Sequence, residues 1–185
     1  MGYAHYFCRK TILDSQQFQL FARDCATLAS RSDIPIAGWD GTGEPVFTDT
    51  EVAFNGVESC GHPVRDLGIT FPDENASGIN MQASPTQTWF AGTLLSQRTC
   101  DGDCSCEGFR IAQHYQGNSD YRKPFDCCKT AYKPYDLLVT ACLISAKHHF
   151  DTDMAVISDG DSNHWDDARQ LCQHVLGYGA NFVLG

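Results

Sequence analysis

The sequence has no apolar run approaching the roughly 18 residues that a membrane-spanning helix needs. Its first residues, MGYAHYFCRKTILD, also lack the basic segment and the apolar stretch that are typical of a signal peptide. We therefore expect a cytoplasmic protein that does not contact a membrane. The ten cysteines are, in such a reducing compartment, more often thiols or metal ligands than disulfides.

Positive charge is scarce in this chain. Lys and Arg total 13 against 23 Asp and Glu, which gives a net charge of −10. Binding to a phosphate backbone requires clustered cations that displace counterions, so the composition argues against a nucleic acid as partner. The carboxylates are also dispersed, without a run of five or more, so the chain does not look like an acidic mimic of DNA.

Two short catalytic patterns are absent as well. The chain has no Gly-x-x-x-x-Gly-Lys-Ser/Thr loop and no Gly-x-Ser-x-Gly turn. The sequence therefore names no reaction outright, and we favour a protein without catalytic activity while leaving an enzyme open.

The order of apolar patterns predicts an α+β fold. Alternating aromatic residues predict a strand over 3–9, and helical spacing of apolar residues predicts a helix within 13–31. The further predicted elements are two short strands within 34–57, a strand at 88–95, a helix over 134–149, a strand over 154–159, a helix over 166–177 and a terminal strand over 180–184. We expect a single domain over 1–185, with a mainly antiparallel sheet, helices packed on one face, and an irregular Cys-rich excursion at about 58–126.

The helix over 134–149 has the clearest pattern. Pro134 suits a first-turn position and Asp136 suits the positive end of the helix dipole. A broad apolar stripe that includes Leu138, Ala141 and Cys142 predicts that one side of this helix faces the sheet.

The segment RTCDGDCSCEGF, residues 98–109, concentrates cysteines in the excursion. Four thiolates can hold a tetrahedral zinc ion, and such a site would stabilise a segment with little core of its own. The predicted ligands of this structural zinc are Cys100, Cys104 and Cys106, with Cys127 or Cys128 as the fourth. Cys60 and His62 are alternative ligands, and free thiols or disulfides are alternatives to a metal site.

Cations gather before the helix over 134–149, although the chain is acidic. Arg122, Lys123, Lys129 and Lys133 all precede its first turn. A helix N-terminus flanked by lysines can bind an anion, and a solvated loop is the structural alternative. Our leading hypothesis is a non-catalytic protein that binds a nucleotide-like anionic small molecule or a host protein through Lys129, Lys133, Tyr135 and His5. The alternative is a small hydrolase or transferase that uses His5 with a neighbouring acid or thiol.

Two parts of the chain look familiar. They are MGYAHYF with GTGEPVFTDTEVAFNG, and CKTAYKPYDLLVTACLISAKHHF running on to VISDGDSNHWDDARQLCQHVLGYGANF. They resemble a group of small uncharacterised bacterial and bacteriophage proteins that share a Gly-Tyr-x-His-Tyr start and a Lys-Pro-Tyr-Asp helix. The resemblance covers roughly residues 1–56 and 127–184, and it implies a phage-type accessory protein of the host cytoplasm, without an established activity.

Overall fold

The computed structural model describes residues 3–32, 34–61, 65–70, 80–82, 88–90, 93–95, 98–100, 102–117 and 124–185. The helices are α1 (Ser15–Ser30), α2 (Asp136–Phe150) and α3 (Asp166–Leu176), with short 3-10 turns at Asp151–Asp153 and Ser162–Trp165. The strands are β1 (Ala4–Arg9), β2 (Ile36–Ala37), β3 (Val46–Thr48), β4 (Glu51–Gly56), β5 (Arg65–Thr70), β6 (Asn80–Gln82), β7 (Thr88–Phe90), β8 (Thr93–Leu95), β9 (Arg98–Cys100), β10 (Phe109–Ala112), β11 (Phe125–Lys129) and β12 (Met154–Ser158).

The described strands pair in antiparallel sheets within one α+β domain, which confirms the predicted fold class. One sheet has the order β11-β1-β12, so the first strand lies between two strands from the C-terminal third of the chain. A second sheet has the order β10-β4-β2, with β3 also paired to β4. Two smaller sheets, β6-β5-β9 and β7-β8, lie within the excursion, whose strand β10 belongs to the second sheet. The strands are thus divided among several sheets, where the sequence predicted one.

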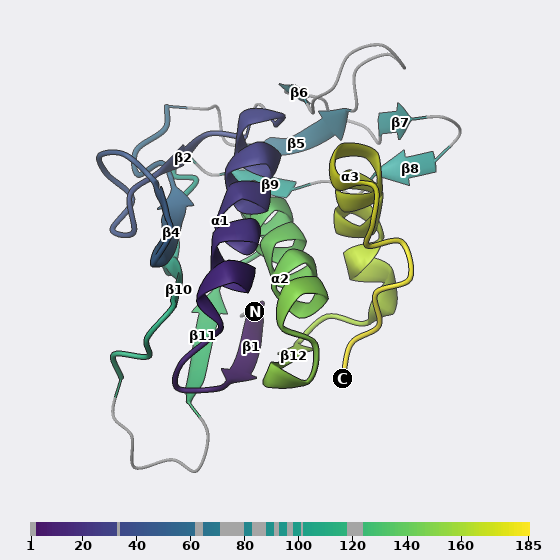
Figure 1. The fold of residues 1–185 in the computed structure, drawn as a ribbon. Helices are drawn as coiled ribbons and strands as arrows, with labels where there is room; N and C mark the ends of the chain where they lie inside the picture. Colours follow the sequence, from purple (N-terminus) through teal and green to yellow (C-terminus); the bar gives the residue numbers. More distant parts are fainter. Residues whose placement is uncertain are drawn as a thin grey trace.

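Helix α2 runs through the centre of the domain. It packs against α1, α3 and β12, and Figure 1 shows α1 and α2 lying side by side. The predicted stripe that includes Leu138 and Ala141 is buried, but Val139, Thr140 and Leu143 are fully buried as well. The neighbouring elements therefore enclose most of its circumference. In the part of the chain that the structure describes, no helix combines the length and apolar character that crossing a bilayer requires.

Helix α1 begins where the sequence indicates. The side chain of Asp14 accepts a hydrogen bond from the backbone N–H of Gln17 at 2.9 Å and so caps the first turn. The apolar residues at helical spacing, Phe18, Phe21, Cys25 and Leu28, are all buried against the rest of the core.

The predicted strands differ from the observed structure in three places. Within 34–57 the chain forms β2, β3 and β4, where the sequence predicted two short strands. The segment 88–95 forms two short strands, β7 and β8, that pair with each other as a hairpin. The predicted terminal strand over 180–184 is wrong, because this segment contains no strand. Gly179 has a positive φ of 102°, and the N–H of Phe182 turns back to the carbonyl of Gly179 at 3.0 Å, so the tail cannot stay extended.

Candidate functional site

His5 lies near the start of β1, the central strand of the β11-β1-β12 sheet, and its side chain contacts the first turn of α2. Alternation along β1 places His5 and Phe7 in the core, while Tyr6 between them is half-buried. The sheet register sets His5 directly opposite Cys128 on β11 and Ser158 on β12. His5 Nδ1 is 3.0 Å from Ser158 Oγ.

The other ring nitrogen of His5 contacts the first turn of α2. His5 Nε2 is 2.8 Å from Asp136 Oδ1, and the Thr130 hydroxyl donates to the same oxygen. Burial opposes ionisation of Asp136, but the hydrogen bond from His5 and the guanidinium of Arg98 outweigh it and hold the pKa of this carboxyl below its usual range.

These contacts assign the roles of the imidazole nitrogens. An ionised carboxylate only accepts hydrogen bonds, so Nε2 of a neutral His5 carries the proton. Nδ1 is then left to accept the hydroxyl proton of Ser158. We call this hydroxyl–imidazole–carboxylate arrangement the Ser158–His5–Asp136 relay, and its order matches that of a serine nucleophile, its general base and the acid that orients the base.

Arg98 on β9 supplies a buried cation next to the relay. Its Nε is 3.6 Å from Asp136 Oδ2, and its Nη1 is 3.3 Å from Asp167 Oδ2 at the start of α3. The guanidinium also stacks on Tyr132, 4.4 Å from the ring centroid. Arg98, Asp136 and Asp167 are all buried, so their charges interact in a medium of low dielectric constant.

Ser158 is the least buried member of the relay, and aromatic rings gather beside it. The Tyr3 ring lies 5.1 Å from His5, 5.0 Å from Tyr132 and 5.8 Å from His164, measured between centroids. The N–H of Gly160 donates to Ser158 Oγ at 3.0 Å, and a Cβ on Gly160 would come within 2.6 Å of the Tyr3 hydroxyl oxygen. The glycine therefore allows the turn after β12 to hold the Ser158 hydroxyl close to Tyr3.

The predicted anion-binding residues have other partners in the structure. Tyr135 is buried, and both its hydroxyl and the ammonium of Lys133 donate at 2.7 Å to main-chain carbonyls of the 102–107 segment. Lys129 is exposed on β11, and the carboxylate of Asp136 already lies at the first turn of α2. Arg122 and Lys123 lie outside the described residues. Binding of an anion here stays a prediction.

Three thiols come together in the excursion. The sulfurs of Cys60 and Cys100 are 3.4 Å apart, as are those of Cys100 and Cys104, and all three lie within 4.8 Å of one another. Burial raises the pKa of both the Cys100 and Cys104 thiols, and a bound cation would favour their thiolate forms. Tetrahedral zinc with bonds of about 2.3 Å separates its sulfur ligands by about 3.8 Å, so this thiol cluster could hold a metal ion.

The thiol cluster includes two of the predicted zinc ligands and one of the alternatives. Cys106 packs against the main core, Cys127 is exposed on β11, and Cys128 is buried and donates to the carbonyl of Glu107. The structure thus places Cys60 beside Cys100 and Cys104, where the sequence predicted Cys106 and either Cys127 or Cys128. His62, the other alternative ligand, lies outside the described residues.

Several residues of the site escaped the sequence analysis. Ser158 was not predicted, although a hydroxyl at the end of a buried strand and before Asp-Gly is a usable signal for an exposed reactive group. Asp136 was predicted only as a residue of the first helical turn. No pattern in the sequence indicates that Arg98 is buried between two carboxylates.

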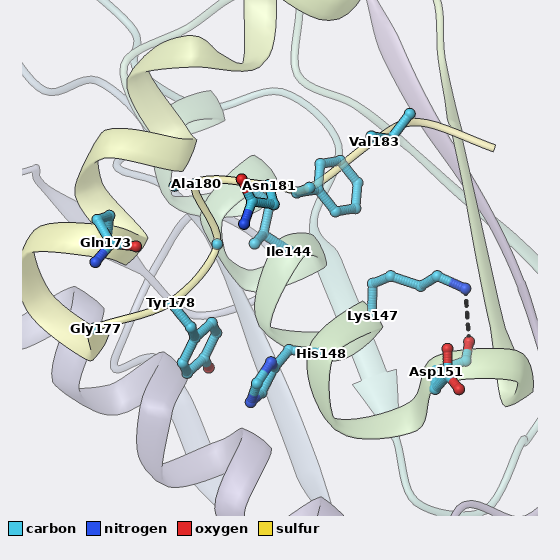
Figure 2. A pocket seen from close by; sticks show the side chains of 12 residues that line it. Ile144, Lys147, His148, Asp151, Gln173, Gly177, Tyr178, Ala180, Asn181 and Val183 are labelled. Carbon is cyan, nitrogen blue, oxygen red and sulfur yellow. Dashed lines mark hydrogen bonds between the residues drawn. The ribbon is translucent and has the colours of Figure 1, made fainter.

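A pocket of about 650 Å³ lies at the ends of α2 and α3, away from the relay (Figure 2). Figure 2 shows the rings of His148 and Tyr178 against each other, with 3.8 Å between their centroids. Lys147 Nζ donates to the carbonyls of Asp151 and Met154 at 2.8 and 3.0 Å. The lining residues carry both signs of charge, from Lys147 and Asp151, and so select no single class of ligand.

A hydrogen-bonded group behind this pocket fixes the C-terminal tail. Asp24 on α1 accepts a hydrogen bond from Tyr178 at 2.7 Å and is 2.8 Å from His149 Nε2. Ser145 lies 2.8 Å from the same Tyr178 hydroxyl. Burial favours the neutral form of Asp24, but the hydrogen bonds from His149 and Tyr178 prevail and lower its pKa.

Comparison with protein-family models, with curated proteins and with solved structures finds no match for this chain. The features that describe this protein are its own. It has an α+β fold of antiparallel sheets around the buried helix α2, with the Ser158–His5–Asp136 relay at the first turn of that helix.

Proposed function

We propose that the protein is a small hydrolase or transferase that transfers an acyl group through Ser158. The observation that carries this proposal is the pair of distances in the relay, 3.0 Å from Ser158 Oγ to His5 Nδ1 and 2.8 Å from His5 Nε2 to Asp136 Oδ1. Both are hydrogen-bond distances suited to proton transfer by a general base. The proposal develops the sequence-based alternative in which His5 acts with a neighbouring acid.

The reaction divides into two transfers. Ser158 Oγ attacks the acyl carbon of an ester, and its proton passes to His5 Nδ1. The carbonyl double bond re-forms, and the alcohol leaves with the proton from Nδ1. Water in a hydrolase, or a second hydroxyl in a transferase, then attacks the acyl-serine ester in the same way and frees Ser158.

The buried charges around His5 support this role. With a neutral imidazole, the group holds one guanidinium, that of Arg98, and the carboxylates of Asp136 and Asp167. When His5 takes the proton of Ser158, the same group holds two cations and two carboxylates. The carboxylates of Asp136 and Asp167 are thus in place before His5 becomes an imidazolium. Charges that are preorganised in this way stabilise a transition state.

Covalent labelling tests the nucleophile. A fluorophosphonate reacts with an activated serine by forming an oxygen–phosphorus bond and releasing fluoride. We expect an adduct on Ser158 by mass spectrometry, none in Ser158→Ala, and labelling slowed at least about a hundredfold in His5→Gln, the scale of general-base catalysis. Ser145→Ala removes a hydroxyl from the separate Tyr178 group and should label like the wild type. Folded wild-type protein without an adduct on Ser158 would disprove the proposal.

We further propose that the thiol cluster holds structural zinc, with no part in the chemistry. The support is the approach of Cys60, Cys100 and Cys104 within 4.8 Å, two of them fully buried. Protein purified without chelator should contain about one equivalent of zinc, and Cys100→Ser should lose it while Cys127→Ser should keep it. Less than about one-tenth equivalent in the wild type would leave only free thiols.

The remaining expectations stay proposals. Binding of a nucleotide-like anion or a host protein is less favoured here than the relay, because Lys133 and Tyr135 donate to main-chain carbonyls. The phage origin and the cytoplasmic location rest on the sequence alone.

A further inference from the structure

Strand β9 connects the thiol cluster to the relay. Its last residue, Cys100, belongs to the cluster, and its first residue, Arg98, contacts Asp136 and Asp167. We propose that a metal ion bound by Cys60, Cys100 and Cys104 holds Arg98 in place and so controls the Ser158–His5–Asp136 relay. This inference rests on the zinc site proposed above and adds a regulation to it.

Strand β9 is short and belongs to a small sheet. Among the described strands it pairs with β5 alone, over three residue pairs, and neither strand belongs to the sheet that contains His5. In the described part of the chain, the ion pairs of Arg98 with Asp136 and Asp167 connect β9 to the core, and the Cys100 thiol connects it to Cys60 and Cys104. A metal ion would add covalent-strength bonds at one end of a three-residue strand whose other end carries the guanidinium.

A second connection runs from the cluster to the first turn of α2. The N–H of Cys104 donates to the carbonyl of Val57, just after β4, at 3.1 Å. From the same segment, the carbonyl of Asp103 accepts from the Lys133 ammonium at 2.7 Å. The cluster thus fixes residues 103–104, which contact Lys133 just before α2. It also fixes β9, which carries Arg98.

Loss of the metal has a definite electrostatic consequence. If β9 moves away, the carboxylates of Asp136 and Asp167 remain buried without the guanidinium between them. Two carboxylates in a medium of low dielectric constant repel each other and must rearrange or take up protons. Either change disturbs the hydrogen bond from His5 Nε2 to Asp136 and so weakens one of the contacts that hold the imidazole.

Hydrogen exchange followed by mass spectrometry measures this coupling without depending on activity. In the full-length protein, removal of zinc by a chelator should speed exchange at least about tenfold in peptides from β1 and the first turn of α2. Peptides from α1, which in the described part of the chain packs against α2, α3, β3 and β4, should exchange at an unchanged rate. Cys127→Ser, with the thiol cluster intact, should respond to the chelator like the wild type.

Variants at Arg98 decide whether the signal passes through this residue. In Arg98→Met, peptides from β1 should exchange fast with or without zinc, so the chelator should add little. Arg98→Lys keeps the positive charge and serves as the test if Arg98→Met fails to fold. The chelator should speed exchange of its β1 peptides less than in the wild type. The inference would be overturned if β1 peptides exchanged at the same rate after removal of zinc. It would also be overturned if both Arg98 variants responded to the chelator as strongly as the wild type.

The outcomes separate the proposals. If the purified protein contains no zinc, both the zinc-site proposal and this inference are disproved. A protein in which the exchange of β1 depends on zinc, but in which a fluorophosphonate does not modify Ser158, keeps the coupling and disproves the catalytic role.

Discussion

Replacement of Leu138 by alanine tests the central position of α2 most directly. Leu138 is 0 % exposed and belongs to the main hydrophobic core. The change removes three carbons, and at about 0.8 kcal/mol for each buried CH₂ the lost transfer free energy is about 2.4 kcal/mol. The cavity that remains adds to this cost, so the free energy of unfolding should fall by about 2.4–5 kcal/mol.

Urea unfolding followed by circular dichroism measures this loss. For a chain of this length, about 2–4 °C per kcal/mol corresponds to a melting temperature lower by about 5–20 °C. Leu20→Ala, on the exposed side of α1 at 36 % exposure, is the matched control and should cost well under half as much. Equal effects of the two changes would mean that α2 does not lie in the core, and the fold described here would be wrong.

Three further predictions concern single residues. Because the pKa of Asp24 is lowered in the folded protein, its stabilisation is complete above the pKa of about 3.9 in the unfolded chain and is lost as pH falls through the folded pKa. Below about pH 4, the urea midpoint of Asp24→Asn should therefore change less with pH than that of the wild type. Asp136→Asn should slow fluorophosphonate labelling of Ser158 at least about a hundredfold, because an amide no longer fixes the imidazole proton; an unchanged labelling rate would contradict the relay. Gly56→Ala places a Cβ 1.8 Å from the carbonyl oxygen of Cys104, so it should cost about 1–3 kcal/mol in urea unfolding and lower the zinc content of the purified protein.

Local signals in the sequence predicted the helices and the class of the fold. The helix predicted within 13–31 from the spacing of its apolar residues is confirmed as α1, where Phe18, Phe21 and Cys25 are buried. For α2 the sequence predicted a buried stripe, whereas α1, α3 and β12 enclose the helix on several sides. The number of neighbours around a helix depends on the topology, which local periodicity does not contain.

The relay could be predicted only in part. His5 was recognisable by its residue type and its position in an aromatic strand, but its partners are 131 and 153 residues away along the chain. Cys60 likewise is 40 residues from Cys100, across a segment without a regular pattern. Short-range spacing cannot identify such partners, because only the strand pairing and the packing of α2 bring them together.

The position of β1 between β11 and β12 has a consequence for synthesis of the protein on the ribosome. At about 5–20 residues per second, the 153 residues between His5 and Ser158 take about 8–30 s to translate. Until β11 has been made, both hydrogen-bonding edges of β1 lack their native partners, and the edge that pairs with β12 stays open until β12 follows; an unpaired strand is prone to join other chains. Chains interrupted before β12 would contain His5 without Ser158, so we expect them to be inactive and to aggregate, whereas the finished chain closes the sheet around its own first strand.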